Sequence, residues 1–170
     1  MHMRRFYKAP YNHDGSRKVF NMGFHPTFLY LFPKLWLISL PFNFVIDSIV
    51  LLIGFKIFGK EKVWHNWKKS ILLSWIFGYI SDIVATFLML GFEFAAGSMF
   101  HTSVMSNPCG HPAKFLCTLF AVLVAGVLIY VFNAKVALRK TELDDKAKKK
   151  VALLMAIVTM PFPFFMPVVF

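Results

Sequence analysis

Long apolar runs dominate this chain and limit what it can fold into. The three clearest runs extend from about residue 35 to 58, from 70 to 96 and from 115 to 138. A helix rises about 1.5 Å per residue, so about 20 apolar residues cross a hydrocarbon layer of roughly 30 Å. Because each run exceeds that length, the sequence predicts three membrane-spanning helices.

A fourth apolar run, from 151 to 170, is less regular because it contains Pro161, Pro163 and Pro167. A proline inside a helix removes a backbone hydrogen bond that lipid cannot replace. We therefore expect a helix through about Met160, followed by a bent or extended end that packs against the other helices. With this run included, the predicted fold is an all-α integral membrane protein, a polytopic bundle of about four transmembrane helices.

The chain is expected to consist of a basic tail over 1–18 and one transmembrane helical domain over 19–170. Residues 19–33 are apolar and aromatic, but Gly23, Pro26 and Pro33 interrupt them. Two arrangements stay open for this segment: it lies in the membrane interface, or it forms a re-entrant arm that returns to its own side. The tail has no apolar core of signal-peptide type, so no cleaved leader is expected.

The composition agrees with a membrane protein. Of the 170 residues, 58% are hydrophobic and 16% are charged, and the mean hydropathy is +0.61. A soluble domain has about 45–50% apolar and about 25% charged residues. No polar stretch is long enough to form a separate soluble catalytic domain. Any chemistry is therefore expected in or beside the bilayer, and no cofactor is predicted.

The net charge of +11 lies mainly in the segments that flank the apolar runs. This placement favours contact with anionic lipid headgroups over binding of nucleic acid. Loops 59–69 and 139–150 are rich in lysine, whereas Lys114 is the one basic residue of loop 97–114. The positive-inside rule then predicts a multi-pass protein of the cell membrane, with the first two loops cytoplasmic and loop 97–114 external.

Two acidic residues stand where charge is costly. Asp47 and Asp82 lie in antiparallel predicted spans, each roughly 16–18 Å from the cytoplasmic end, so they are expected at similar depth. No lysine or arginine lies at that depth, and an ionised carboxylate in hydrocarbon costs several kcal/mol. Helical periodicity adds polar neighbours on the same faces. The predicted ion or substrate track comprises Asn43, Asp47, Asp82, Thr86 and Glu93.

These acids support two functional hypotheses. In the first, the protein is a small transporter, channel or ion-coupled subunit whose acidic pair handles a proton or cation. In the second, it is a non-catalytic accessory or scaffold subunit of a membrane complex, and the acids are neutral and join helices by hydrogen bonds. The spacing of the residues is compatible with both hypotheses.

The predicted external loop gathers cysteine and histidine. A disulfide between Cys109 and Cys117 is expected if this side is oxidising. Metal binding by His101 and His111 is a weaker alternative, because no pair has the C-x-x-C or H-x-x-x-H spacing, and no metal site is predicted. A further alternative is a membrane-embedded hydrolase in which a histidine activates one of the thiols.

Small residues mark one face of the third predicted span. Cys117, Ala121 and Ala125 repeat every four residues, next to Gly126. Small side chains allow the backbones of two helices to approach closely. Besides the lipid bilayer, we therefore expect either another helix or another copy of the chain on this face, and the second alternative implies a homo-oligomer or a larger membrane complex.

Overall fold

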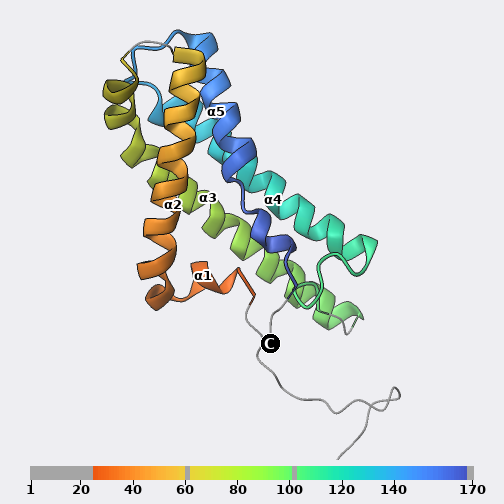
Figure 1. Cartoon of the computed structure of the whole chain (residues 1–170). Coiled ribbons are helices and arrows are strands. Elements are labelled where there is room, and N and C mark those ends of the chain that lie inside the picture. The colour runs from red at the N-terminus through yellow and green to blue at the C-terminus, as the bar shows by residue number, and fades with distance from the viewer. Residues whose placement is uncertain (1–24, 60–61, 101–102, 168–170) are drawn as a thin grey trace, which may run out of the picture.

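The computed structural model describes residues 25–59, 62–100 and 103–167, and this part of the chain is helical without strands (Figure 1). Its α-helices are α1 (Phe28–Leu31), α2 (Pro33–Gly54), α3 (Val63–Phe100), α4 (Pro112–Phe132) and α5 (Asp145–Thr159). Two π-helical turns, η1 (Phe55–Gly59) and η2 (Asn133–Ala137), extend α2 and α4, and a 3-10 turn, η3 (Phe162–Phe165), follows α5.

Three helices are long and apolar enough to cross a membrane, at residues 33–59, 63–97 and 112–137. They correspond to the three clearest predicted spans, which confirms the expected apolar helices. The second helix begins seven residues before the predicted start at 70, because residues 63–69 contain no glycine or proline that would end a helix.

The expected fourth span is a shorter element. Helix α5 has 15 residues and begins inside the basic segment, where Asp144 caps it by accepting a hydrogen bond from the Ala147 amide. It ends at Thr159, two residues before Pro161, and the chain continues into η3 with Phe164 fully buried. In the described residues, three helices rather than four therefore have the length and hydropathy of a membrane span.

Helices α2, α3, α4 and α5 lie together at one end of the bundle, while α3 and α4 continue toward the other end (Figure 1). One buried cluster joins α2, α4 and α5 around Leu51, Phe55 and Val151. A second cluster joins α3, α4, η3 and the loop before α4 around Met89, Ala121 and Phe164.

The small-residue face of α4 packs against other elements of the same chain. Ala121 and Ala125 are fully buried in the second cluster, and Cys117 packs against it. The predicted oligomer contact through Cys117, Ala121 and Ala125 is therefore corrected: this face lies against α3 and η3 of the same chain. The sequence identified a close helix contact but could not identify the partner.

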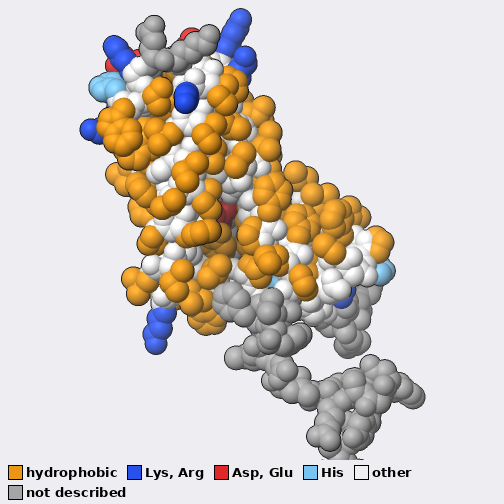
Figure 2. Space-filling model, viewed as in Figure 1, with side chains coloured by type: hydrophobic (Ala, Val, Ile, Leu, Met, Phe, Trp, Pro, Cys, Tyr) orange, Lys and Arg blue, Asp and Glu red, His pale blue; other side chains and the backbone are white. Residues whose placement is uncertain are grey.

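Exposed apolar side chains cover the middle of the molecule, and lysine and arginine side chains gather mostly at one end (Figure 2). That end holds the start of α3 and the start of α5. A surface of this kind suits a hydrocarbon environment with a polar boundary. The chain is thus a candidate multi-pass membrane protein.

Residues 25–32 pack on the bundle. His25 and Thr27 are fully buried, and the Tyr30 ring lies 5.9 Å from that of Phe164 and 5.4 Å from that of Tyr79. The interfacial and re-entrant arrangements of 19–33 differ in membrane depth, so both stay predictions, and residues 19–24 lie outside the described part.

Candidate functional site

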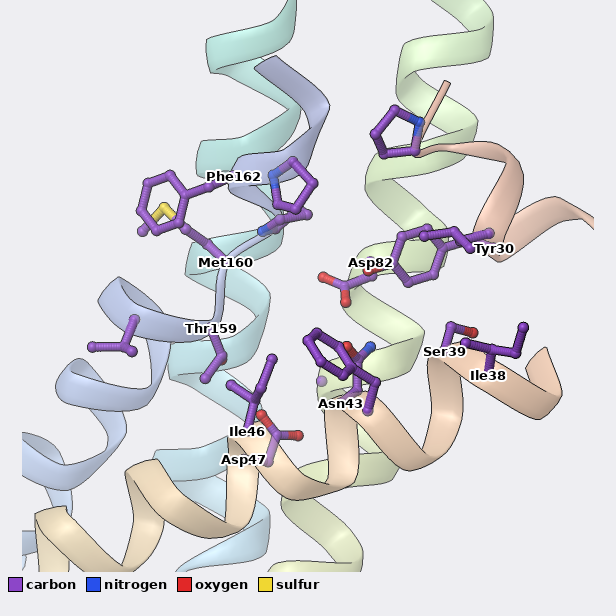
Figure 3. A pocket seen from close by; sticks show the side chains of 17 residues that line it. Tyr30, Ile38, Ser39, Asn43, Ile46, Asp47, Asp82, Thr159, Met160 and Phe162 are labelled. Atoms are coloured by element: carbon purple, nitrogen blue, oxygen red, sulfur yellow. The ribbon is translucent and has the colours of Figure 1, made fainter. Parts of the chain in front are cut away.

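A cavity of about 250 Å³ lies between α1, α2, α3 and residues 158–163. Residues 158–159 are the end of α5, and residues 160–163 follow it. We call it the acidic pocket, because the side chains of Asp47 and Asp82 point into it from α2 and α3 (Figure 3). Figure 2 shows acidic atoms at the bottom of a hollow in the otherwise apolar face. The volume is enough for several water molecules.

Asp47 reaches the pocket because α3 has a glycine opposite it. The Asp47 side chain comes from the middle of α2, and the residue is 5% exposed. A Cβ atom added at Gly78 would lie 3.3 Å from the Asp47 Oδ2 atom, which is tighter than an ordinary contact. The absence of a side chain at Gly78 therefore lets the carboxylate approach the α3 backbone.

Asp82 lies one helical turn after Gly78 on α3 and is also 5% exposed. Its Oδ1 atom is buried and has no hydrogen-bond partner in the described residues. The Tyr30 side chain interacts with Asp82 and with Asn43, which lies one turn before Asp47 on α2. Tyr30, Asn43 and the two acids thus form one group of polar side chains facing the cavity (Figure 3).

The pocket has acids but no basic side chain. None of the described residues that line it is lysine, arginine or histidine. The two carboxylates also interact electrostatically with each other. Two ionised carboxylates would therefore be desolvated and would repel each other, and a shared proton or a bound cation would relieve both costs.

Two aromatic side chains outside the pocket lining join α2 and α3 next to the pocket. The Tyr79 hydroxyl and the Ser39 hydroxyl are 3.2 Å apart and hydrogen-bond across α2 and α3. The Trp36 ring packs edge-on against Tyr79 at 5.8 Å. These contacts join α2 and α3 beside the acids.

Two residues of the predicted track lie elsewhere. Thr86 is fully buried outside the pocket lining, and its hydroxyl has no partner among the described residues. Glu93 accepts hydrogen bonds from the backbone amides of Val104 and Met105 at 2.7 and 3.0 Å. Glu93 thus anchors the loop between α3 and α4. The structure brings Asn43, Asp47 and Asp82 together and leaves Thr86 and Glu93 apart from them.

Sequence reasoning did not find Tyr30, Thr159 or Met160, which also line the pocket. They come from segments interrupted by prolines, where no helical period indicates which side chains face inward. The proximity of Pro161 and Pro163 to the end of α5 was the only signal that this segment would fold back.

The predicted cysteine and histidine site has a different arrangement. Cys109 and Cys117 are free thiols in the structure, so the disulfide stays a prediction. His111 caps α4, because its Nδ1 atom accepts a hydrogen bond of 3.2 Å from the Ala113 amide. His101 lies outside the described residues, and within the described part no group of three or more histidine, cysteine or acidic residues could hold a metal.

No family model matches this chain, and no curated protein or solved structure matches it either.

Proposed function

We propose that the acidic pocket binds a proton or a small monovalent cation, and that the protein is a small transporter, channel or ion-coupled membrane subunit. One observation carries the proposal: Asp47 and Asp82 face one cavity without a basic residue in its described lining. Intramembrane acids of this kind are costly and mark ion or proton pathways in membrane proteins.

Tyr30 interacts with the Asp82 carboxylate, but the hydrogen bonds leave one of its oxygens available to an ion. A role as helix glue requires a partner for each buried polar atom, as Ser39 and Tyr79 provide for each other. The Asp82 Oδ1 atom lacks such a partner in the described part of the chain. A proton or cation would supply the missing interaction.

The pocket walls also offer a route for access. Ile38 and Phe42 on one side and Phe162 on the other line the pocket and are at least half exposed. Pro41 lies inside α2 and removes the amide that would bond to the Leu37 carbonyl. We propose that α2 bends at Pro41 and that this bending changes access to Asn43 and the acids.

Ion flux into proteoliposomes tests the proposal. With a membrane potential imposed, the wild-type protein should move protons, Na⁺ or K⁺ faster than empty vesicles do. Asp47→Asn and Asp82→Asn preserve side-chain size but remove the ionisable group. Each should lower the flux at least about tenfold, a barrier increase of roughly 1.4 kcal/mol.

Asp144→Asn is the matched control, because it makes the same chemical change at an exposed side chain outside the acidic pocket, and asparagine also caps a helix N-terminus. It should transport like the wild type. Wild-type flux equal to that of empty vesicles for all three ions would overturn autonomous transport. Equal flux in the wild type and both aspartate variants would exclude a role of the acids and favour the scaffold hypothesis.

A further inference from the structure

A second pocket, of about 200 Å³, lies at the basic end of the molecule between the end of α4, η2 and the first turns of α5. Its lining includes Lys135, Lys148 and Lys149, and one acid, Asp145. The Lys148 side chain is 19% exposed, whereas that of Asp145 is 93% exposed. The Lys148 Nζ atom lies 3.8 Å from the Asp145 Oδ1 atom, but the carboxylate lies mostly in solvent, and three lysines against one acid leave the pocket positively charged.

Lys148 pairs with Asp145 within α5 and Lys150 lies over the Phe58 ring, but these contacts involve only two of the lysines in the first turns of α5. The first six residues of the helix include four lysines, Lys146, Lys148, Lys149 and Lys150. A helix N-terminus carries partial positive charge and favours anions, so cations there are unfavourable. An anion bound in this pocket would be stabilised by the lysines and by the helix dipole together.

An apolar groove continues from the basic pocket. It has a volume of about 280 Å³ and lies between α4 and α5, and Tyr130 lines both the groove and the basic pocket. Its rim is formed by exposed apolar side chains of both helices, which are Leu123, Val127, Leu153 and Ile157. From Tyr130 to Leu123 it follows α4 for about 10 Å.

Gly126 keeps the groove open at its base. A Cβ atom added at Gly126 would lie 3.3 Å from the Met160 Cε atom and 3.9 Å from the Ala156 carbonyl oxygen. The two helices therefore pack closely at the bottom, while larger side chains form the walls. Helices α4 and α5 contact each other beneath the groove, so it lies along the outside of the α4–α5 seam.

We propose that this seam between α4 and α5 binds one anionic phospholipid, with the phosphate held by Lys135, Lys148 and Lys149 and an acyl chain in the groove. Basic pockets between membrane helices suit such headgroups. Tyr130 lies where the polar and apolar parts of the lipid meet, a position that suits its ring and hydroxyl. A soluble anion would use the lysines alone and would leave the groove without a function.

Native mass spectrometry of the delipidated full-length protein in neutral detergent tests this inference. Phosphatidylglycerol should bind in a saturable one-to-one complex, and phosphatidylcholine with the same chains should bind more weakly. The double variant Lys135→Gln/Lys148→Gln should lower the affinity for phosphatidylglycerol by about 30-fold, because each basic residue near a membrane surface contributes a factor of roughly five. Lys135→Arg/Lys148→Arg should retain binding.

The matched control is Lys140→Gln/Lys146→Gln, which removes two exposed lysines at the same end but outside the pocket lining. It should bind phosphatidylglycerol like the wild type. An equal loss in this control would show general surface attraction and overturn a defined site. Equal affinity for phosphatidylcholine would overturn recognition of the headgroup charge. Displacement of the lipid by inorganic phosphate at equal concentration would overturn the role of the groove.

Discussion

Ser74 and Asp82 lie two helical turns apart on α3 and are both buried, but their surroundings differ. The Ser74 hydroxyl donates to the Asn133 Oδ1 atom, and the Asn133 amide nitrogen donates to the Ile129 carbonyl oxygen at 2.9 Å. We call Ser74 and Asn133 the Asn133 pair. The Asp82 carboxylate has an oxygen without a partner in the described residues and a second acid in the same cavity.

The difference separates a satisfied polar contact from one that leaves a buried oxygen without a partner. Buried polar groups are normally hydrogen-bonded, and a satisfied pair between helices stabilises the bundle. A buried carboxylate oxygen that has no donor or cation costs free energy instead. The Asn133 pair is thus explained by stability, whereas the partnerless oxygen of Asp82 is compatible with the proposed ion binding.

The largest effect on stability is expected from breaking the Asn133 pair. Asn133→Ala should lower the free energy of unfolding by about 1–3 kcal/mol, because it leaves the buried Ser74 hydroxyl without its acceptor. Thermal or detergent-induced unfolding of the purified protein measures this change. Ser74→Ala should cost a similar or smaller amount, and the double variant should cost less than the sum of the two. A loss of only a few tenths of a kcal/mol would mean that the pair is not structural.

Much of this comparison could be predicted from the sequence. Hydropathy identified the three apolar helices, and the positions of Asp47 and Asp82 along two antiparallel spans predicted that they would lie close together. Both predictions depend on regular helices, where residue spacing determines depth and face. Asn43 was placed with the acids by the same argument.

The rest depends on contacts that periodicity does not encode. Tyr30 and Met160 reach the acidic pocket through turns at prolines, and Glu93 faces a loop instead of the helices. The length of α5 depends on the Asp144 cap and on Pro161, and a hydropathy pattern contains no information on either. Ala121 is a related case. Its small side chain indicates a close contact but does not identify the helix on the other side of that contact.

Replacing Asp82 should change the free energy of unfolding in the opposite direction to Asn133→Ala. Asp82→Leu should leave the free energy of unfolding unchanged or raise it by up to about 2 kcal/mol, because replacing a poorly paired buried charge by an apolar side chain removes a desolvation cost. The same unfolding measurement applies, with Asp82→Asn as the control that keeps a polar group. A loss above about 1 kcal/mol, comparable to that of Asn133→Ala, would make Asp82 a structural residue and remove the contrast.

The smallest effect is expected at Glu142, which is paired like Asn133 but exposed to solvent. Its carboxylate lies 2.8 Å from the Lys62 Nζ atom, 3.1 Å from His65 Nε2 and 3.2 Å from Lys69 Nζ. These contacts join the start of α3 to the segment before α5. Comparison with the Asn133 pair therefore separates the effect of pairing from the effect of burial.

The hydrogen bonds from Lys62 and Lys69 lower the pKa of Glu142 from 4.5 to about 2. Because the folded pKa is depressed, the stabilisation is present above the unfolded value of 4.5 and is lost as the pH falls toward about 2. Glu142→Gln should lower the melting temperature slightly at neutral pH, and the difference from wild type should shrink in acid and in high salt, since water and ions screen exposed pairs. A difference that persists unchanged across this pH range would show that the side chain acts through packing. A difference as large as that of Asn133→Ala would show that pairing, without burial, is sufficient to stabilise this bundle.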